Sequence, residues 1–259
     1  MSGEIAEPIN GVSAWMGEKE TFHVVLNDPD RRNAQDPQMW QRLVDVATSI
    51  PEDARFIVIS GAGRDFSAGL NKALFDPASK AETLWAVARR DDAGRRKFID
   101  QAQRAFRIWQ EIPAISISLV QGNAIGAGFA LALACDFMIT APGAHVELRE
   151  PKLGIIADLG ASARLVPALG YSRALLVEAG LPLTGKQAFE WGLSVACAED
   201  LNAAMEHLRD GLQQAQPAAL RAVKELVRRV HAGGDPWLTE QQVQSAHLEQ
   251  LVRMMEHHG

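Results

Sequence analysis

Stretches rich in β-branched residues alternate with helix-prone segments along the chain, and this alternation constrains the fold more than any other feature. Strands are predicted over residues 21–26, 56–60, 115–120 and 136–140. A helix is predicted to follow the first strand, because Asp36 is a good N-cap residue and Pro37 suits the first helical position. Such alternation is typical of an α/β fold in which helices cover a sheet.

The chain becomes helical after about residue 198. Helices are predicted near 200–214, 217–231 and 239–256, where Pro217 and the 233–236 segment Gly-Gly-Asp-Pro act as breaks. Residues 78–110 are also charged and helix-prone, with a turn-like interruption near 91–94. We therefore expect a core formed by residues 1–198 and a helical C-terminal region formed by residues 199–259.

Composition excludes several classes of function. The chain has 259 residues, 26 Lys and Arg against 32 Asp and Glu, and a formal net charge of −6. The basic surface of a nucleic-acid-binding protein is therefore not expected. The two cysteines and the scattered histidines match no disulfide framework and no zinc-ligand spacing, so no bound metal is expected. The N-terminus has no secretory signal pattern and the longest apolar run is too short to cross a bilayer, which predicts a soluble cytoplasmic protein without a membrane partner.

Two glycine-rich turns each follow a predicted strand. The first, GAGRDFSAGLN at 61–71, matches neither a dinucleotide fingerprint nor a nucleophile elbow, because Phe66 and Asp65 stand where glycine is required. Ser67 is therefore interpreted as structural. The second, QGNAIGAGF at 121–129, leads into a helix of small residues whose N-terminus suits negative charge, although its glycines also allow close packing on the sheet. Together the turns predict two N–H donors that converge on one oxygen, as in an oxyanion hole.

A third turn, at 148–160, contains two carboxylates among apolar residues. Glu150 and Asp158 are candidates for proton transfer near neutral pH, since apolar surroundings raise carboxyl pKa values. Two simpler interpretations remain open. Asp158 is also a suitable N-cap for a helix from residue 159, and Glu150 could pair with Arg149 on the surface.

Five segments in this order resemble the crotonase superfamily of enoyl-CoA hydratases and isomerases. They are LNDPDRRNA, GAGRDFSAGLN, GNAIGAGFALALACDF, LREPKLGIIADLGASARL and LTGKQAFEWGL. The resemblance implies a crotonase-like spiral of ββα repeats in residues 1–198 and a trimerisation region in residues 199–259. It further implies an acyl-CoA substrate, no cofactor apart from the CoA of that substrate, and a homotrimer or dimer of trimers.

The resemblance also assigns roles to individual positions. The backbone N–H groups of Leu70 and Ala127 would hold the thioester oxygen, and Glu150 matches the family's catalytic glutamate. Three residues would line the site of the CoA nucleotide: Arg31, Arg32 and Ala34. Four others would shape the pantetheine channel and the thioester pocket: Ala68, Gly69, Gly126 and Asn71, of which Asn71 stands where the family often has Asp.

One position departs from the hydratases. Ala130 stands where they carry a second glutamate, and a methyl group cannot transfer a proton, which disfavours two-glutamate hydration. The third turn resembles that of dienoyl-CoA isomerases, with acids at Glu150 and Asp158, although those enzymes also have Asp at the Ala130 position. We therefore favour double-bond isomerisation with Glu150 as base and Asp158 as second acid. The alternatives are hydration by Glu150, alone or with Asp158, and an acyl-CoA-binding protein without catalysis.

Overall fold

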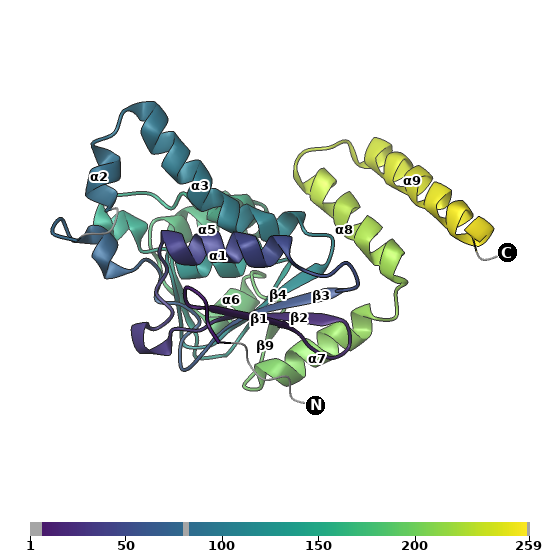
Figure 1. Cartoon of the computed structure of the whole chain (residues 1–259), viewed down its shortest axis with the longest axis horizontal. Helices are drawn as coiled ribbons and strands as arrows, with labels where there is room; N and C mark the ends of the chain where they lie inside the picture. The colour runs from purple at the N-terminus through teal and green to yellow at the C-terminus, as the bar shows by residue number, and fades with distance from the viewer. Residues whose placement is uncertain (1–6, 80–82, 258–259) are drawn as a thin grey trace.

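The fold is built on a six-stranded sheet, seen in a computed structural model that describes residues 7–79 and 83–257 (Figure 1). Its strand order is β1-β2-β3-β4-β6-β9. Among the described strands of this sheet, the β1–β2 pair is antiparallel and the other pairs are parallel. The strands are β1 Val12–Met16, β2 Thr21–Leu26, β3 Phe56–Gly61, β4 Ile115–Val120, β6 Phe137–Thr140 and β9 Ala196–Cys197.

The sheet buries both of its faces, and side chains alternate between them along each strand. In β3, Ile57 and Ile59 pack into the cluster that contains α1 (Pro37–Thr48), α3 (Asp92–Glu111) and α4 (Ala127–Ala134). Phe56 and Val58 face the opposite side, where Met205 of α7 (Leu201–Leu212) completes a smaller cluster. The structure therefore has a helix–sheet–helix arrangement.

A second, three-stranded sheet lies beside α4. It has the order β5-β7-β8, with β5 at Asn123–Ile125, β7 at His145–Glu147 and β8 at Leu183–Thr184. The β5 strand runs directly into α4, whose residues are all buried, and α4 packs between α3 and α5 (Ala161–Glu178). Because alanine and glycine occupy little volume, α4 can lie within the core.

The last two helices extend away from the sheet. Figure 1 shows α9 (Pro236–His257) lying against α8 (Pro217–His231). The Nζ atom of Lys224 in α8 donates to Asp136 Oδ2 at 2.6 Å and to the Ala114 carbonyl at 2.8 Å, which ties α8 to the core. The shorter helical segments are η1 Pro29–Arg31, η2 Lys72–Phe75, α2 Leu84–Ala88, η3 Glu150–Leu153 and α6 Gly185–Glu190.

The mixed α/β fold and the four predicted strands are confirmed, as are the Asp36 cap and the helical C-terminal segments. The predicted interruption near 91–94 is confirmed but lies slightly earlier, because α2 ends at Ala88 and α3 begins at Asp92, where Asp91 caps the helix by accepting from the Gly94 N–H at 2.8 Å. Part of the predicted 78–110 segment, residues 80–82, lies outside the described residues.

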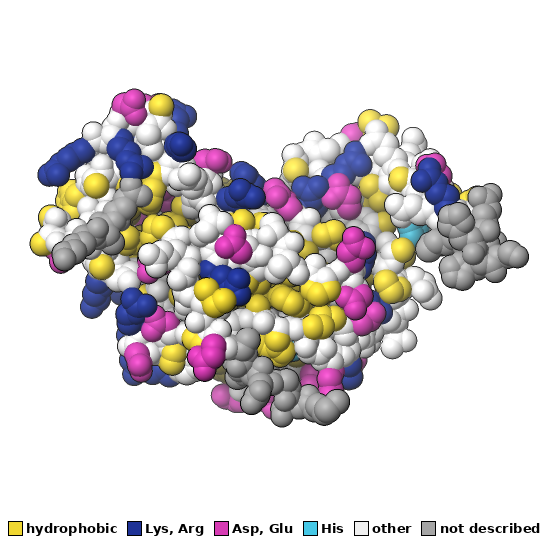
Figure 2. Space-filling model, viewed as in Figure 1, with side chains coloured by type: hydrophobic (Ala, Val, Ile, Leu, Met, Phe, Trp, Pro, Cys, Tyr) yellow, Lys and Arg dark blue, Asp and Glu magenta, His cyan; other side chains and the backbone are white. Residues whose placement is uncertain are grey.

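None of the described helices is long and apolar enough to cross a membrane. On the face shown in Figure 2, Lys and Arg side chains are interspersed with Asp and Glu. Within the described residues, no three His, Cys, Asp or Glu side chains are grouped as metal ligands would be.

Candidate active site

The two glycine-rich turns lie side by side and pair in parallel. Ser67 and Ala124 are bridge partners. The Ser67 N–H donates to the Asn123 carbonyl at 2.9 Å, and the Ile125 N–H donates to the Ser67 carbonyl at 3.0 Å. Leu70 and Ala127 stand at equivalent positions, three residues after these bridge partners. The structure therefore brings together the two turns that were predicted to supply the donors.

Gly69 allows the closest approach between these turns. A β-carbon at residue 69 would lie 2.4 Å from the Ile125 carbonyl oxygen and 3.8 Å from the Ala127 nitrogen. Gly69 also has φ = +84°, which favours glycine. The backbone immediately before Leu70 is thus packed against the backbone immediately before Ala127.

Within the described part of the chain, the N–H groups of Leu70 and Ala127 are free to bind a ligand. Residues on either side of Leu70 bond to Gln35, with Gln35 N donating to the Gly69 carbonyl and Asn71 N donating to the Gln35 carbonyl, both at 2.7 Å. Ala127 is the first residue of α4, where an N–H has no acceptor within the helix. Among the described residues neither N–H donates a hydrogen bond. Two such donors beside a helix N-terminus suit an oxygen that gains negative charge.

Glu150 lies against the same helix N-terminus. It begins η3 and is 8% exposed. Its Oε1 atom is 2.7 Å from the place that a β-carbon on Gly126 would take, and Gly126 immediately precedes Ala127. The interpretation of Glu150 as a surface partner of Arg149 is therefore wrong, because Glu150 is buried and Arg149 pairs with Glu147.

The protonation properties of Glu150 suit proton transfer. Burial raises the pKa of the Glu150 carboxyl, and the charge of Asp158 raises it further. Within the described part of the chain, its Oε2 atom is buried and has no hydrogen-bond partner. A carboxylate with a raised pKa and an unused oxygen can accept and return a proton near neutral pH.

Asp158 lies close enough to Glu150 for its charge to raise the Glu150 pKa. Burial also raises the pKa of its carboxyl. Gln103 of α3 donates to the Asp158 backbone carbonyl at 2.6 Å, which fixes the loop that carries it. The N-cap of α5 is Gly160, so the interpretation of Asp158 as a helix cap is wrong. Ala130, one turn into α4, is buried and adds no acid.

The residues predicted to contact CoA lie at or just after the end of η1 and in the two glycine-rich turns. Arg31 is exposed and pairs with Asp28, whereas the half-exposed Arg32 donates from Nε to Asp65 Oδ2 at 2.7 Å. Ala34 and Ala68 are half-buried, and the Ala68 N–H donates to the Arg32 carbonyl at 2.9 Å. The Asn71 side chain accepts from the Ala73 N–H and caps η2.

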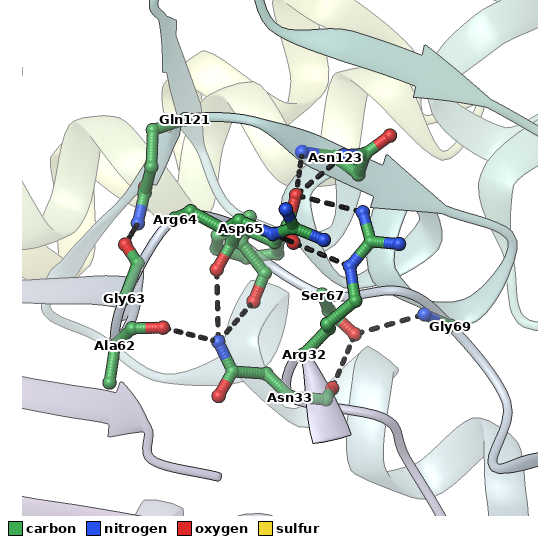
Figure 3. A network of polar contacts seen from close by, with 11 residues as sticks. Arg32, Asn33, Ala62, Gly63, Arg64, Asp65, Ser67, Gly69, Gln121 and Asn123 are labelled. Carbon is green, nitrogen blue, oxygen red and sulfur yellow. Dashed lines mark hydrogen bonds and ion pairs between the residues drawn. The ribbon is translucent and has the colours of Figure 1, made fainter. Parts of the chain in front are cut away.

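Two buried acids of this region were missed in the sequence. Asp65 is held by Arg32, Arg64 and Asn123 (Figure 3). Burial raises the pKa of Asp65, but the hydrogen bonds from Arg32 and Asn123 outweigh it and lower the pKa well below its usual range.

Glu147 is the second missed acid and is 2% exposed. Burial raises its pKa, but hydrogen bonds from Arg149, Lys152 and His145 outweigh this effect and lower the pKa to about 2. The spacing of His145 and Glu147 was the available signal, because residues two apart on a strand share a face, and Arg149 follows two residues after the strand. The Glu147 carbonyl accepts from the Gly126 N–H at 2.7 Å, so this cluster adjoins the site.

Comparison with known families matches residues 17–256 to the enoyl-CoA hydratase/isomerase model. The human mitochondrial Δ(3,5)-Δ(2,4)-dienoyl-CoA isomerase is 35% identical over 160 residues, which are 59% of this chain and 47% of that protein. The 1,2-epoxyphenylacetyl-CoA isomerase of Escherichia coli K12 is 33% identical over 202 residues, 76% of this chain and 71% of that protein. The chain spans about half the length of the dienoyl-CoA isomerases that it matches.

Solved structures agree with this match. A Thermobifida fusca YX protein crystallised with acetoacetyl-CoA superposes with a TM-score of 0.83 at 30% identity, covering 95% of this chain and 96% of that one. A CoA complex from the same organism gives a TM-score of 0.82.

Proposed function

The chain belongs to the enoyl-CoA hydratase/isomerase family, and on that premise we propose that it shifts the double bond of an unsaturated acyl-CoA thioester. The observation that carries this proposal is the buried Glu150 carboxylate, which has an unpartnered Oε2 atom and lies beside the free N–H of Ala127. Asp158 would supply a second acid, since its charge raises the pKa of Glu150, whereas Ala130 supplies none.

In the proposed reaction, Glu150 removes a proton from the α-carbon of the substrate. The electron pair of that C–H bond moves toward the thioester, and the carbonyl oxygen becomes an enolate oxygen. The N–H groups of Leu70 and Ala127 bind this oxygen, each donor being worth about 3 kcal/mol in the transition state. A proton returned to the γ- or ε-carbon, by Asp158 or by Glu150 itself, restores the C=O bond and leaves the C=C bond moved.

We further propose how the protein binds its acyl-CoA substrate and how its subunits assemble. Arg31, Arg32 and Ala34 would contact the CoA nucleotide, and the channel for pantetheine and the thioester would be shaped by Ala68, Gly69, Asn71 and Gly126. CoA is then part of the substrate, and no separate cofactor is needed. We also propose the ββα spiral for residues 1–198, trimerisation through residues 199–259 as a trimer or a dimer of trimers, and a cytoplasmic location.

To test this proposal, the purified protein is incubated separately with 3-enoyl-CoA, 3,5-dienoyl-CoA and 2-enoyl-CoA, and the product of each reaction is identified by chromatography. We expect the double bond to move in at least one of the first two substrates and water addition to 2-enoyl-CoA to be slow. Rapid hydration without isomerisation would contradict the proposal.

Hydration is the second candidate, because the unpartnered Oε2 atom of Glu150 could equally hold a water molecule. This mechanism predicts that Glu150→Gln abolishes water addition and that Asp158→Asn weakens it. Full hydratase activity in the Glu150→Gln protein would reject it. A protein that binds acyl-CoA but turns over none of the three substrates would instead be a non-catalytic acyl-CoA-binding protein.

A further inference from the structure

We propose that Asp65, paired with Arg32, is the positioning residue of the oxyanion hole: it holds the turns of Leu70 and Ala127 in the register that aims both N–H groups at one oxygen. This inference rests on the proposed function, because it concerns the same pair of donors.

The Asp65 carboxylate joins three segments that are distant in the sequence (Figure 3). Its Oδ1 atom accepts from the Asn123 backbone N–H at 2.9 Å and from the Asn123 side chain at 2.5 Å. Its Oδ2 atom accepts from Arg32 Nε at 2.7 Å and from Arg64 Nε at 3.2 Å. The side chain is 2% exposed, so the carboxylate depends on these donors for its stabilisation.

The contact to Asn123 lies at the start of the paired turns. Asp65 precedes Ser67, and Asn123 precedes Ala124, where the two segments form their bridge. Both segments then continue to their donor residues, Leu70 and Ala127. A shift of Asp65 relative to Asn123 would therefore also displace Leu70 and Ala127, because only a few residues of paired backbone separate them from this contact.

Hydrogen bonds from Asn33 and Ser67 also hold the backbone of the turn that leads from Asp65 to Leu70. Asn33 Nδ2 donates to the Asp65 carbonyl at 2.9 Å and to the Phe66 carbonyl at 3.1 Å. Ser67 Oγ donates to the Asn33 carbonyl at 2.7 Å and accepts from the Gly69 N–H at 3.2 Å. These bonds fix the backbone between Asp65 and Leu70, so the position of Asp65 determines the position of Leu70.

The ion pair with Asp65 gives Arg32 a role beyond its predicted contact with the CoA nucleotide. Its guanidinium donates through both Nε and Nη2 to the Asp65 carboxylate, with the second contact at 3.3 Å. A planar guanidinium that donates from two nitrogens fixes the direction of its partner, which an ammonium cannot do. Arg32 therefore orients Asp65, and loss of Arg32 affects the reaction step as well as CoA binding.

The test compares Asp65→Asn and Arg32→Gln with wild-type protein. Three quantities are measured: kcat and KM on the enoyl-CoA that the protein converts, the affinity for CoA by calorimetry, and the ultraviolet absorbance of bound acetoacetyl-CoA. The absorbance reports the fraction of this 3-ketothioester that is bound as its enolate. That fraction depends directly on the oxyanion donors, whether or not the protein isomerises any substrate.

A matched control is Asp136→Asn. Asp136 is likewise an ion-paired carboxylate that accepts a backbone N–H, with Lys224 Nζ at 2.6 Å and Ser116 N at 2.8 Å. It contacts none of the paired turns, so its loss measures the general effect of removing such a carboxylate.

For Asp65→Asn we expect kcat to fall at least tenfold, because small displacements of catalytic groups have large effects on rate. KM and CoA affinity should change less than threefold, and the enolate fraction should fall. Arg32→Gln should also lower kcat and the enolate fraction. If Asp65→Asn does not fold, the Arg32→Gln protein alone tests the positioning role. Asp136→Asn should retain the wild-type kcat and the wild-type enolate fraction.

The positioning role would be overturned if the folded Asp65→Asn protein kept the wild-type kcat and enolate fraction. If Asp65→Asn does not fold, the same result in Arg32→Gln would overturn it. A wild-type protein that binds acetoacetyl-CoA as the enolate but converts no enoyl-CoA would contradict the proposed isomerisation alone. In that case the enolate measurement on the variants still tests Asp65.

Discussion

The Oε1 atom of Glu150 lies 2.7 Å from the position that a β-carbon on Gly126 would occupy. Two real atoms cannot approach so closely without a shift, so the carboxylate uses space that exists only because residue 126 has no side chain. The same residue has φ = +52° and immediately precedes the free N–H of Ala127. One glycine thus places the Glu150 carboxylate and the Ala127 N–H next to each other.

Gly126→Ala should therefore lower activity more than it lowers stability. The added methyl displaces Glu150, and we expect kcat to fall about 100-fold, with a loss of about 1–3 kcal/mol in the free energy of unfolding from the positive φ. Gly143→Ala is the control, because a β-carbon there meets nothing within 4 Å. Steady-state rates and urea unfolding measure both effects. Equal activity in the two variants would show that Glu150 does not need this space.

The pH dependence of the reaction should report the coupling between Glu150 and Asp158. A base acts when deprotonated, so a raised Glu150 pKa places the acidic limb of the kcat profile above the pH expected for an ordinary glutamate. Asp158→Asn removes a charge that raises this pKa, and the limb should shift to lower pH. An unshifted limb in the Asp158→Asn protein would show that the two carboxyls do not interact.

The sequence was most informative where the signal is local. Runs of β-branched residues set the strands, and the turns of Leu70 and Ala127 were expected to meet because each follows a strand of one sheet. The pairing of Arg32 with Asp65 spans 33 residues and depends on how those turns dock, which no local pattern encodes. The break before α3 was predicted a few residues too late, because Asp91 has the chemistry of both a turn residue and a helix cap.

Cys135 should be chemically inert in the folded protein. Burial raises the pKa of its thiol to about 12, so almost no thiolate forms at neutral pH. Native protein treated with iodoacetamide should carry no label on Cys135, as read by peptide mass spectrometry, whereas protein unfolded in urea should be labelled there. Cys197 is partly exposed and provides the internal comparison. Labelling of Cys135 at the rate of Cys197 would contradict its burial.

Glu147 should contribute stability that depends on pH. Its folded-state pKa of about 2 lies below the ordinary value of 4.5. The stabilisation is therefore complete above pH 4.5 and is lost as the pH falls toward 2.

Glu147→Gln removes the charge that holds Arg149, Lys152 and His145. At pH 7 we expect it to cost about 2 kcal/mol of unfolding free energy, a typical value for hydrogen bonds to a charged group. Near pH 3 the difference from wild type should shrink, because Glu147 is then mostly protonated in the unfolded chain but ionised in the folded protein, so that folding must release a proton. Urea unfolding at both pH values measures the change.

The control for Glu147→Gln is Glu190→Gln, because Glu190 forms an exposed pair with Lys186 at 3.9 Å. Such a pair contributes at most about 0.5 kcal/mol, so this variant should unfold like wild type at pH 7. A Glu147→Gln protein as stable as the Glu190→Gln protein would show that the three cations do not stabilise the fold through Glu147. Because the Glu147 carbonyl also accepts from Gly126, a destabilised Glu147→Gln protein should also lose activity, through the loop that carries Glu150.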